Sequence, residues 1–341
     1  MDCKRKFILG WKSTLRSIES GVRRIERESR KHQRELEKQR QQIEKMQELE
    51  RAQYEVELYE NYVELLLSVH KECGPIWDWE KLRSAESPLK PKRSNANQNA
   101  AQAKLYRFKP TVLDKVFKRN KKKRAALELA VEVAKKTDVR EYKKALKAYE
   151  NEFANWKAIC KLAEDVLAGN TKAYIESIHK TNPFNDITEL GSSIKFHAKS
   201  SSCIEAILCV KSEEIIPTET KSLLKSGKVS IKKMPVTKYY ELYQDYVCGC
   251  ILRVARELFA LLPVEFVIVT AVADLLNTQT GHMDEQPISS VGIPRVTFEK
   301  LNFDMLDPSD SMGNFLHKMN FQKTKGFKAV DKISLTEIQK S

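Results

Sequence analysis

Three polar side chains in the C-terminal part of the chain could do chemistry if the fold brought them together: Asp274, His282 and His317. Asp274 and His282 lie in a polar segment, residues 273–285, that directly follows the apolar run 264–272. Ligands commonly bind just past the C-terminal ends of strands in α/β sheets, and a His beside carboxylates can act as a general base. A polar turn between two strands has the same composition, so both interpretations stay open.

A hydrolase or nuclease with its site in the 274–285 loop is therefore one functional hypothesis. Asp274 would then be a carboxylate ligand for a divalent metal such as Mg²⁺. The next apolar strand, 289–295, contains neither an acid nor a Lys to complete a nuclease motif. His317 follows Asp307-Pro308-Ser309-Asp310, but that tetrapeptide is typical of a helix start. We favour a protein without enzymatic activity or cofactor, and a metal is expected only under the hydrolase or nuclease hypothesis.

The strongest electrostatic signal is a concentration of positive charge in the middle of the chain. Between Lys104 and Lys147 there are 16 Lys and Arg against 5 Asp and Glu, a net of +11 in a chain whose formal charge is +14. Such a region attracts phosphate backbones or an acidic protein surface. The alternative is a solvated turn between helices, whose charge keeps the protein soluble. The predicted anion-binding residues are Lys115, Lys118, Arg119, Lys121, Lys122, Lys123 and Arg124.

Aromatic residues precede this basic stretch, since Tyr106 and Phe108 lie just before it. Single-strand binders use aromatic side chains beside a cationic groove, so the pattern is compatible with nucleic-acid binding. No zinc-finger, RNA-recognition or helix-turn-helix signature accompanies it. A nucleic-acid accessory factor is therefore the second alternative function.

The first 72 residues form a charged helical pattern with a thin apolar stripe. The stripe follows alternating three- and four-residue steps, the spacing of a coiled coil, and a stripe this narrow needs a partner helix. We predict self-association through Ile18, Val22, Ile25, Leu36, Ile43 and Met46. A single helix packed on its own domain is the alternative. Past Met46 the stripe shifts phase and gains Tyr residues, so we expect this inner half to dock on the helices of residues 104–182.

Local patterns predict the elements that must position these residues. Gly74-Pro75 ends the arm, and Trp77 and Trp79 are expected to anchor its base. Helices are predicted over 125–136 and 139–167, separated by an N-cap at Thr137-Asp138. Further predicted elements are strands at 194–198, 204–210, 229–231, 264–272 and 288–293, a turn at 226–227, and a helix over 236–262 with an Arg253–Glu257 pair.

Together these patterns predict a multidomain α and α+β protein. The predicted parts are a coiled-coil arm (1–72), a linker (73–103), a basic helical segment (104–182), a C-terminal α+β or α/β domain (183–335) and a tail (336–341). Seven Cys residues without regular spacing are typical of a reducing compartment, and neither a signal peptide nor an 18-residue apolar run is evident. We therefore expect a cytoplasmic interaction protein without a membrane span, which forms homo-oligomers and binds an anionic partner.

Overall fold

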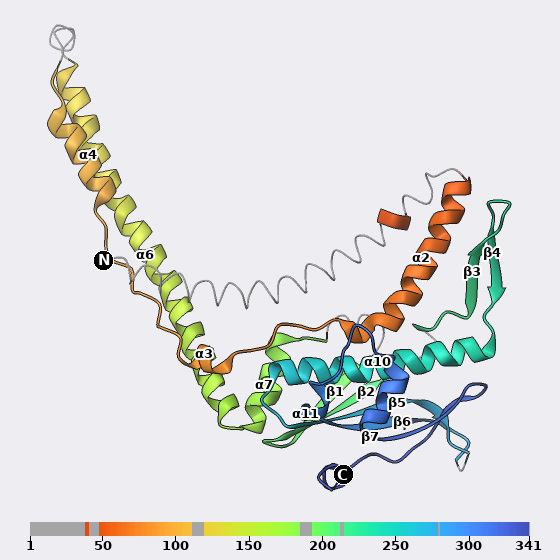
Figure 1. Cartoon of the computed structure of the whole chain (residues 1–341). Coiled ribbons are helices and arrows are strands. Elements are labelled where there is room, and N and C mark those ends of the chain that lie inside the picture. Colours follow the sequence, from red (N-terminus) through yellow and green to blue (C-terminus); the bar gives the residue numbers. More distant parts are fainter. Residues whose placement is uncertain are drawn as a thin grey trace. The chain divides into compact units, whose positions relative to one another are not determined.

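The computed structural model in Figure 1 describes residues 38–40, 48–110, 119–184, 193–211, 215–278 and 280–340. The chain forms two compact units. The first contains the described residues of 81–161, and the second contains those of 12–80 and 162–341. The predicted combination of helical parts with a C-terminal α+β domain is confirmed. The predicted oligomerisation residues, Ile18 to Met46, lie outside the described residues.

A mixed sheet is the centre of the second unit, with the strand order β1-β2-β5-β6-β7-β8. Strands β2 and β5 run parallel, whereas the other neighbouring pairs run antiparallel. The strands predicted at 194–198, 204–210, 264–272 and 288–293 are confirmed, whereas the last two strands of the sheet were not predicted. The strands are β1 (Ser193–Ser200), β2 (Cys203–Cys209), β5 (Phe266–Leu276), β6 (Met283–Pro294), β7 (Leu316–Gln322) and β8 (Gly326–Lys328).

Strand β5 is buried on both faces, as its continuous apolar run predicts. The helix α10 (Val236–Leu261) packs on the sheet, and Ile268 contributes to a buried cluster with Ile333 and Ile338. Ile338 belongs to α13 (Leu335–Ile338), which lies partly in the predicted tail. A hydrogen bond of 3.0 Å from the Ile333 backbone N–H to Ser290 Oγ fixes this C-terminal segment to the sheet.

The predicted Arg253–Glu257 pair on α10 is confirmed, and it is almost fully buried. Arg253 Nη2 lies 2.9 Å from Glu257 Oε1, and the two side chains are 6% and 4% exposed. The same carboxylate oxygen accepts a hydrogen bond of 2.8 Å from the Gly74 backbone N–H. A Cβ atom at Gly74 would lie 2.9 Å from Glu257 Oε2, so a larger residue there would displace this carboxylate. The end of the arm is thereby fixed to α10.

Helix α2 (Glu48–Ser68), continued by the 3₁₀ turn η1 (Val69–Lys71), packs against α10 and a small hairpin. The hairpin consists of β3 (Glu219–Leu223) and β4 (Val229–Lys233), and Gly227 makes its predicted turn with φ +78°. Tyr62 donates a 2.7 Å hydrogen bond to the Ile215 carbonyl. The inner half of the arm therefore docks on the C-terminal domain, whereas we expected it to dock on the helices of residues 104–182.

The segment after η1 is anchored by its two tryptophans, as predicted. The Trp77 backbone N–H donates to the Ala260 carbonyl at 2.8 Å, and Trp79 Nε1 donates to the Leu261 carbonyl. The two rings stack with their centroids 5.4 Å apart. These bonds occupy carbonyl groups at the C-terminal end of α10, which have no partner within the helix.

The first unit contains α4 (Ala96–Arg107) and most of α6 (Asn120–Leu167), and the short helix α3 (Trp79–Arg83) leads into it. The predicted helix break at Thr137-Asp138 is wrong, because α6 is continuous through these residues. Thr137 Oγ1 bonds back to the Val133 carbonyl at 3.0 Å, and Asp138 caps another helix. The range 73–103, predicted as a linker, includes α3 and the start of α4.

The remaining elements are short connections in the second unit. The predicted helix start at Asp307 is confirmed, since its side chain accepts a bond from the Asp310 backbone N–H at 2.9 Å. These elements are α7 (Thr171–Thr181), α11 (Arg295–Phe298), α12 (Pro308–Ser311) and η2 (Met312–Asn314).

Candidate functional site

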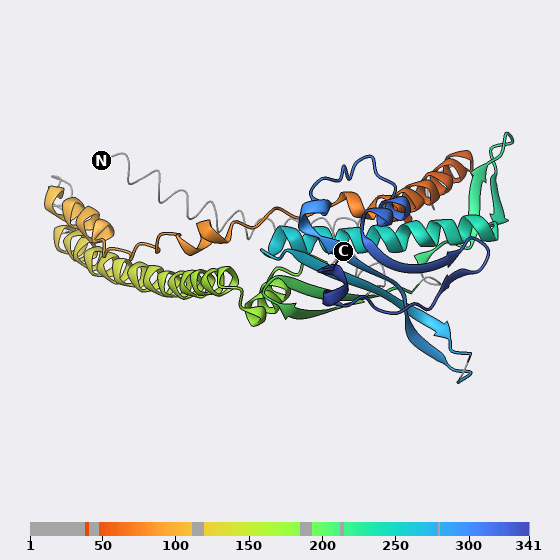
Figure 2. The same ribbon diagram turned by 60° about the horizontal axis from the view of Figure 1, so that its bottom comes forward.

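Helices α4 and α6 form an antiparallel hairpin that carries the basic residues (Figures 1 and 2). Asp138, in the middle of α6, caps the N-terminus of α4. Its Oδ2 accepts from the Gln98 backbone N–H at 2.9 Å, and its Oδ1 accepts from the Asn97 backbone N–H at 3.2 Å and from Asn97 Nδ2 at 2.9 Å. Helix N-termini have free N–H groups and favour negative charge, which explains this contact.

A second set of contacts fixes the segment before α4 to the same side of α6. Trp156 Nε1 donates to the Ala85 carbonyl at 3.0 Å, and Cys160 Sγ donates to the Leu82 carbonyl at 3.5 Å. Trp156 ends a row of aromatic rings with Tyr149 and Phe153, whose neighbouring centroids are 5.8 and 5.3 Å apart. Residues 82–107 therefore run antiparallel to α6 and meet it at two defined points.

The tip of this hairpin is strongly cationic. Its described residues, 104–110 and 119–124, include eight Lys and Arg and no Asp or Glu. All eight are exposed. We call this group the basic tip, and it consists of Lys104, Arg107, Lys109, Arg119, Lys121, Lys122, Lys123 and Arg124. Two of the predicted anion-binding residues, Lys115 and Lys118, lie outside the described residues, and the other five belong to the basic tip.

One ion pair of the basic tip is defined in the described part of the chain. Arg124 forms an ion pair of 3.2 Å with Glu128 one turn further along α6, and both side chains are largely exposed. An exposed pair of this kind holds its partners weakly. Tyr106, between Lys104 and Arg107, is 92% exposed and offers a ring face beside the charges. The arrangement can bind an anion with several phosphate or carboxylate groups.

Sequence analysis missed three members of the basic tip, namely Lys104, Arg107 and Lys109. They lie near the end of α4, and the hairpin brings them close to the start of α6. These three residues were counted in the net charge of residues 104–147, but they were not named as anion-binding residues. However, local sequence gave no reason to place α4 against α6, because that contact depends on Asp138, about 40 residues away.

The three predicted catalytic residues are exposed and do not form one site. Asp274 lies on β5 opposite Glu285 of β6, and His282 ends the turn between these strands, directly before β6. His317 lies on β7 opposite Val291. Val291 and Glu285 are six residues apart on β6, so His317 and Asp274 are separated by about 20 Å along the sheet.

The polar segment between β5 and β6 forms a hairpin turn. The Asn277 backbone N–H donates to the His282 carbonyl at 2.8 Å, and Asn277 Nδ2 donates to Asp284 Oδ2 at 3.0 Å. Gly281 supports the turn with φ +73°. His317 Nδ1 lies 3.1 Å from the Phe315 carbonyl, within its own strand region. The contacts of these residues are those of a turn and a strand, which is the alternative that the sequence left open.

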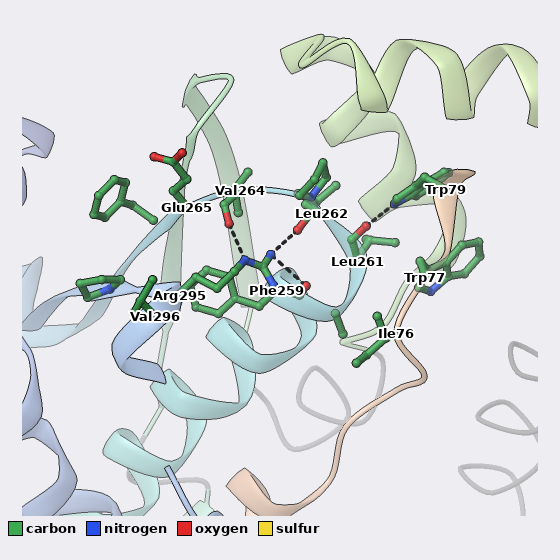
Figure 3. A pocket seen from close by; sticks show the side chains of 14 residues that line it. Ile76, Trp77, Trp79, Phe259, Leu261, Leu262, Val264, Glu265, Arg295 and Val296 are labelled. Carbon is green, nitrogen blue, oxygen red and sulfur yellow. Dashed lines mark hydrogen bonds between the residues drawn. The ribbon is translucent and has the colours of Figure 1, made fainter. Parts of the chain in front are cut away.

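A cleft of about 590 Å³ lies at the C-terminal end of α10 (Figure 3). Its walls are mainly apolar, with Trp77 and Ile76 on one side and Val296 on another, and Glu265 is its acidic residue. Ile76 and Val296 are 84% and 69% exposed. The cleft has room for an apolar side chain or a small apolar molecule.

Arg295 in this cleft acts as a cap for α10. Its Nη2 donates to the Phe259 and Leu262 carbonyls at 3.1 and 2.6 Å, and its Nε donates to the Val264 carbonyl at 2.8 Å, as Figure 3 shows. Its guanidinium carbon also lies 4.6 Å from the centroid of the Phe259 ring. A cation at a helix C-terminus is favourable, so these bonds account for Arg295 structurally.

The chain matches no protein-family model, no curated protein and no solved structure. Within the described ranges, no group of three or more His, Cys, Asp and Glu side chains is arranged to hold a metal ion. None of the helices in that part of the chain is long and apolar enough to cross a membrane. The basic tip is the candidate functional site because it brings together eight exposed cations with no Asp or Glu among its described residues.

Proposed function

We propose that this protein is an interaction protein that binds an anionic partner through the basic tip of the α4–α6 hairpin. One observation carries the proposal: eight exposed Lys and Arg with no Asp or Glu among the described residues of the tip. Cations held on a rigid support create a positive field and release counterions when they bind a polyanion. Because the side chains are exposed, binding requires little desolvation of buried charge.

The test measures binding of fluorescently labelled inorganic polyphosphate to the full-length protein by anisotropy. The variant K121Q/K122Q/K123Q/R124Q removes four charges and keeps good helix formers. The control K225Q/K228Q/K232Q/K233Q removes four charges from the β3–β4 hairpin in the second unit. We expect a loss of affinity of at least tenfold for the tip variant at 100 mM salt and less than a twofold change for the control. Equal affinities of the two variants would refute the proposal.

We also propose self-association through the heptad positions from Ile18 to Met46, which rests on their spacing in the sequence. A cytoplasmic location belongs to the same proposal. It is supported by six free cysteines in the described part of the chain, which suit a reducing compartment. Light scattering of the full chain should give more than one chain per particle, and removal of residues 1–47 should give a monomer. A monomeric full chain would contradict self-association.

A further inference from the structure

A second basic surface follows the side of α6 that faces away from α4. With 3.6 residues per turn, residues 122, 126, 129, 133, 136, 140 and 147 share one side of the helix, with 143 and 144 flanking it. All are exposed, and Leu129 and Val133 are 66% and 55% exposed. We call the cations of this side the outer stripe, and they are Lys122, Lys136, Arg140, Lys143, Lys144 and Lys147.

The outer stripe has one cation at Lys122 and five between Lys136 and Lys147, and no acid lies on its own side. The acidic residues of α6 between 122 and 147 lie roughly 70° or more from the centre line of the stripe. No cation of the stripe makes an ion pair or side-chain hydrogen bond with another described residue. The known contacts of α6 with residues 82–107 use its opposite side, through Asp138 and Trp156. The outer stripe is therefore open to a partner along its length, so far as the described residues extend.

We infer that the outer stripe binds the phosphate backbone of a nucleic-acid duplex. This inference rests on the proposed function and extends its site from the tip along the helix. From Lys122 to Lys147 the stripe is about 38 Å long, at 1.5 Å per residue. A duplex presents one negative charge per about 1.7 Å of its axis, so about 11 base pairs lie along this length. A helix side of this length can therefore meet phosphates of both strands where the backbones cross its path.

The composition of the outer stripe favours a duplex over other polyanions. Protein–protein interfaces are depleted of Lys and enriched in aromatic residues at their cores, whereas five of the six cations here are Lys and the stripe contains no aromatic residue. Helices that lie on membranes have an apolar centre line along their length, whereas here only Leu129 and Val133 are large apolar residues near the centre, and Arg140 and Lys147 occupy it further along. Single-strand binders stack bases on aromatic rings, and the stripe offers none. Cations without aromatic anchors are typical of contacts to a duplex backbone.

The test measures binding of the full-length protein to a labelled 20-base-pair duplex as a function of salt. The stripe variant K136Q/R140Q/K143Q/K144Q/K147Q leaves the basic tip intact. Its control K225Q/K228Q/K232Q/K233Q/K238Q removes five charges from the second unit. Each lost phosphate contact makes the negative slope of log K against log salt less steep by about 0.9. We expect the steepness of this slope to decrease by about 3 to 4.5 for the stripe variant and to stay unchanged for the control. At 100 mM salt the stripe variant should bind the duplex at least tenfold more weakly.

The outcomes separate this inference from the proposed function. If the stripe variant binds the duplex like its control while the tip variant still loses polyphosphate binding, the inference is wrong and the proposed function stands. If the tip variant keeps polyphosphate binding, the proposed function itself fails. Tighter binding of a 20-base single strand than of the duplex, or displacement of the duplex by polyglutamate at equal charge concentration, would also overturn the duplex assignment. Circular dichroism of each variant checks that α6 remains folded.

Discussion

The buried pair of Arg253 and Glu257 gives a quantitative test of how the arm is held on the C-terminal domain. The two side chains are 6% and 4% exposed and 2.9 Å apart, and Glu257 also accepts the Gly74 N–H. Removing one partner of a buried pair leaves an uncompensated charge and typically costs about 3–5 kcal/mol. We therefore expect R253M and E257Q each to lower the free energy of unfolding of the second unit by about 3–5 kcal/mol.

The double variant R253M/E257Q should recover much of this loss. It contains no buried charge at the pair, Met fills the volume of the Arg stem, and Gln keeps an acceptor for the Gly74 N–H. Replacing a buried pair by neutral groups is often close to neutral in stability. We expect a cost of about 1–2 kcal/mol for the double variant, so the coupling energy of the cycle should be at least about 4 kcal/mol.

Urea unfolding followed by tryptophan fluorescence measures this cycle, because Trp77 and Trp79 are bonded to the C-terminal end of α10. With a denaturant dependence of about 2.5 kcal/mol per M, each single variant should shift the midpoint down by about 1 to 2 M. E257A is a further comparison, since it also removes the acceptor of the Gly74 N–H. Single variants that each cost less than 1 kcal/mol and add without coupling would refute the reasoning.

Three further predictions concern contacts of the arm and the hairpin. G249A should lower the free energy of unfolding by about 1–2 kcal/mol, because a Cβ at this position would lie 2.8 Å from Val69 Cγ1. This cost should exceed the gain from the higher helix propensity of Ala. Faster proteolysis within α2 would confirm the prediction. His70 is 1% exposed, and desolvation, with the nearby charge of Lys71, lowers the pKa of its imidazole. The unfolded state then binds the proton more readily, so stability should fall as pH drops below about 6.5, and urea midpoints at pH 7.5 and 5.5 should differ less in H70L than in the wild type. D138A should remove hydrogen-exchange protection from the first turn of α4 while α6 stays protected, and unchanged protection of Asn97 and Gln98 would contradict the capping role.

The sequence by itself determined the elements whose signals are local. Sequence analysis did not predict β3, β7 and β8. The predicted strands within β1, β2, β4, β5 and β6, the turn at Gly227, the Asp307 helix start and the Arg253–Glu257 spacing all depend on residues within a few positions of one another. Apolar periodicity, turn residues and i,i+4 pairing act at that range, so these predictions are confirmed. The positive charge of residues 104–147 was also evident, because charge is a property of composition.

Only the tertiary structure decided which of these elements meet. Asp138 is a residue type that commonly caps a helix beginning at its own position. In the structure its carboxylate caps α4, which begins about 40 residues earlier, and α6 continues through Asp138. Asp274 and His317 are residue types that could act together in catalysis, but strand register places them about 20 Å apart along the sheet. Helix α2 packs on α10 and the β3–β4 hairpin, and no local sequence pattern indicates this contact. Contacts between distant segments and strand register depend on the packing of the whole unit. The sequence therefore predicted the positive charge of residues 104–147 but not the α4–α6 hairpin that carries it.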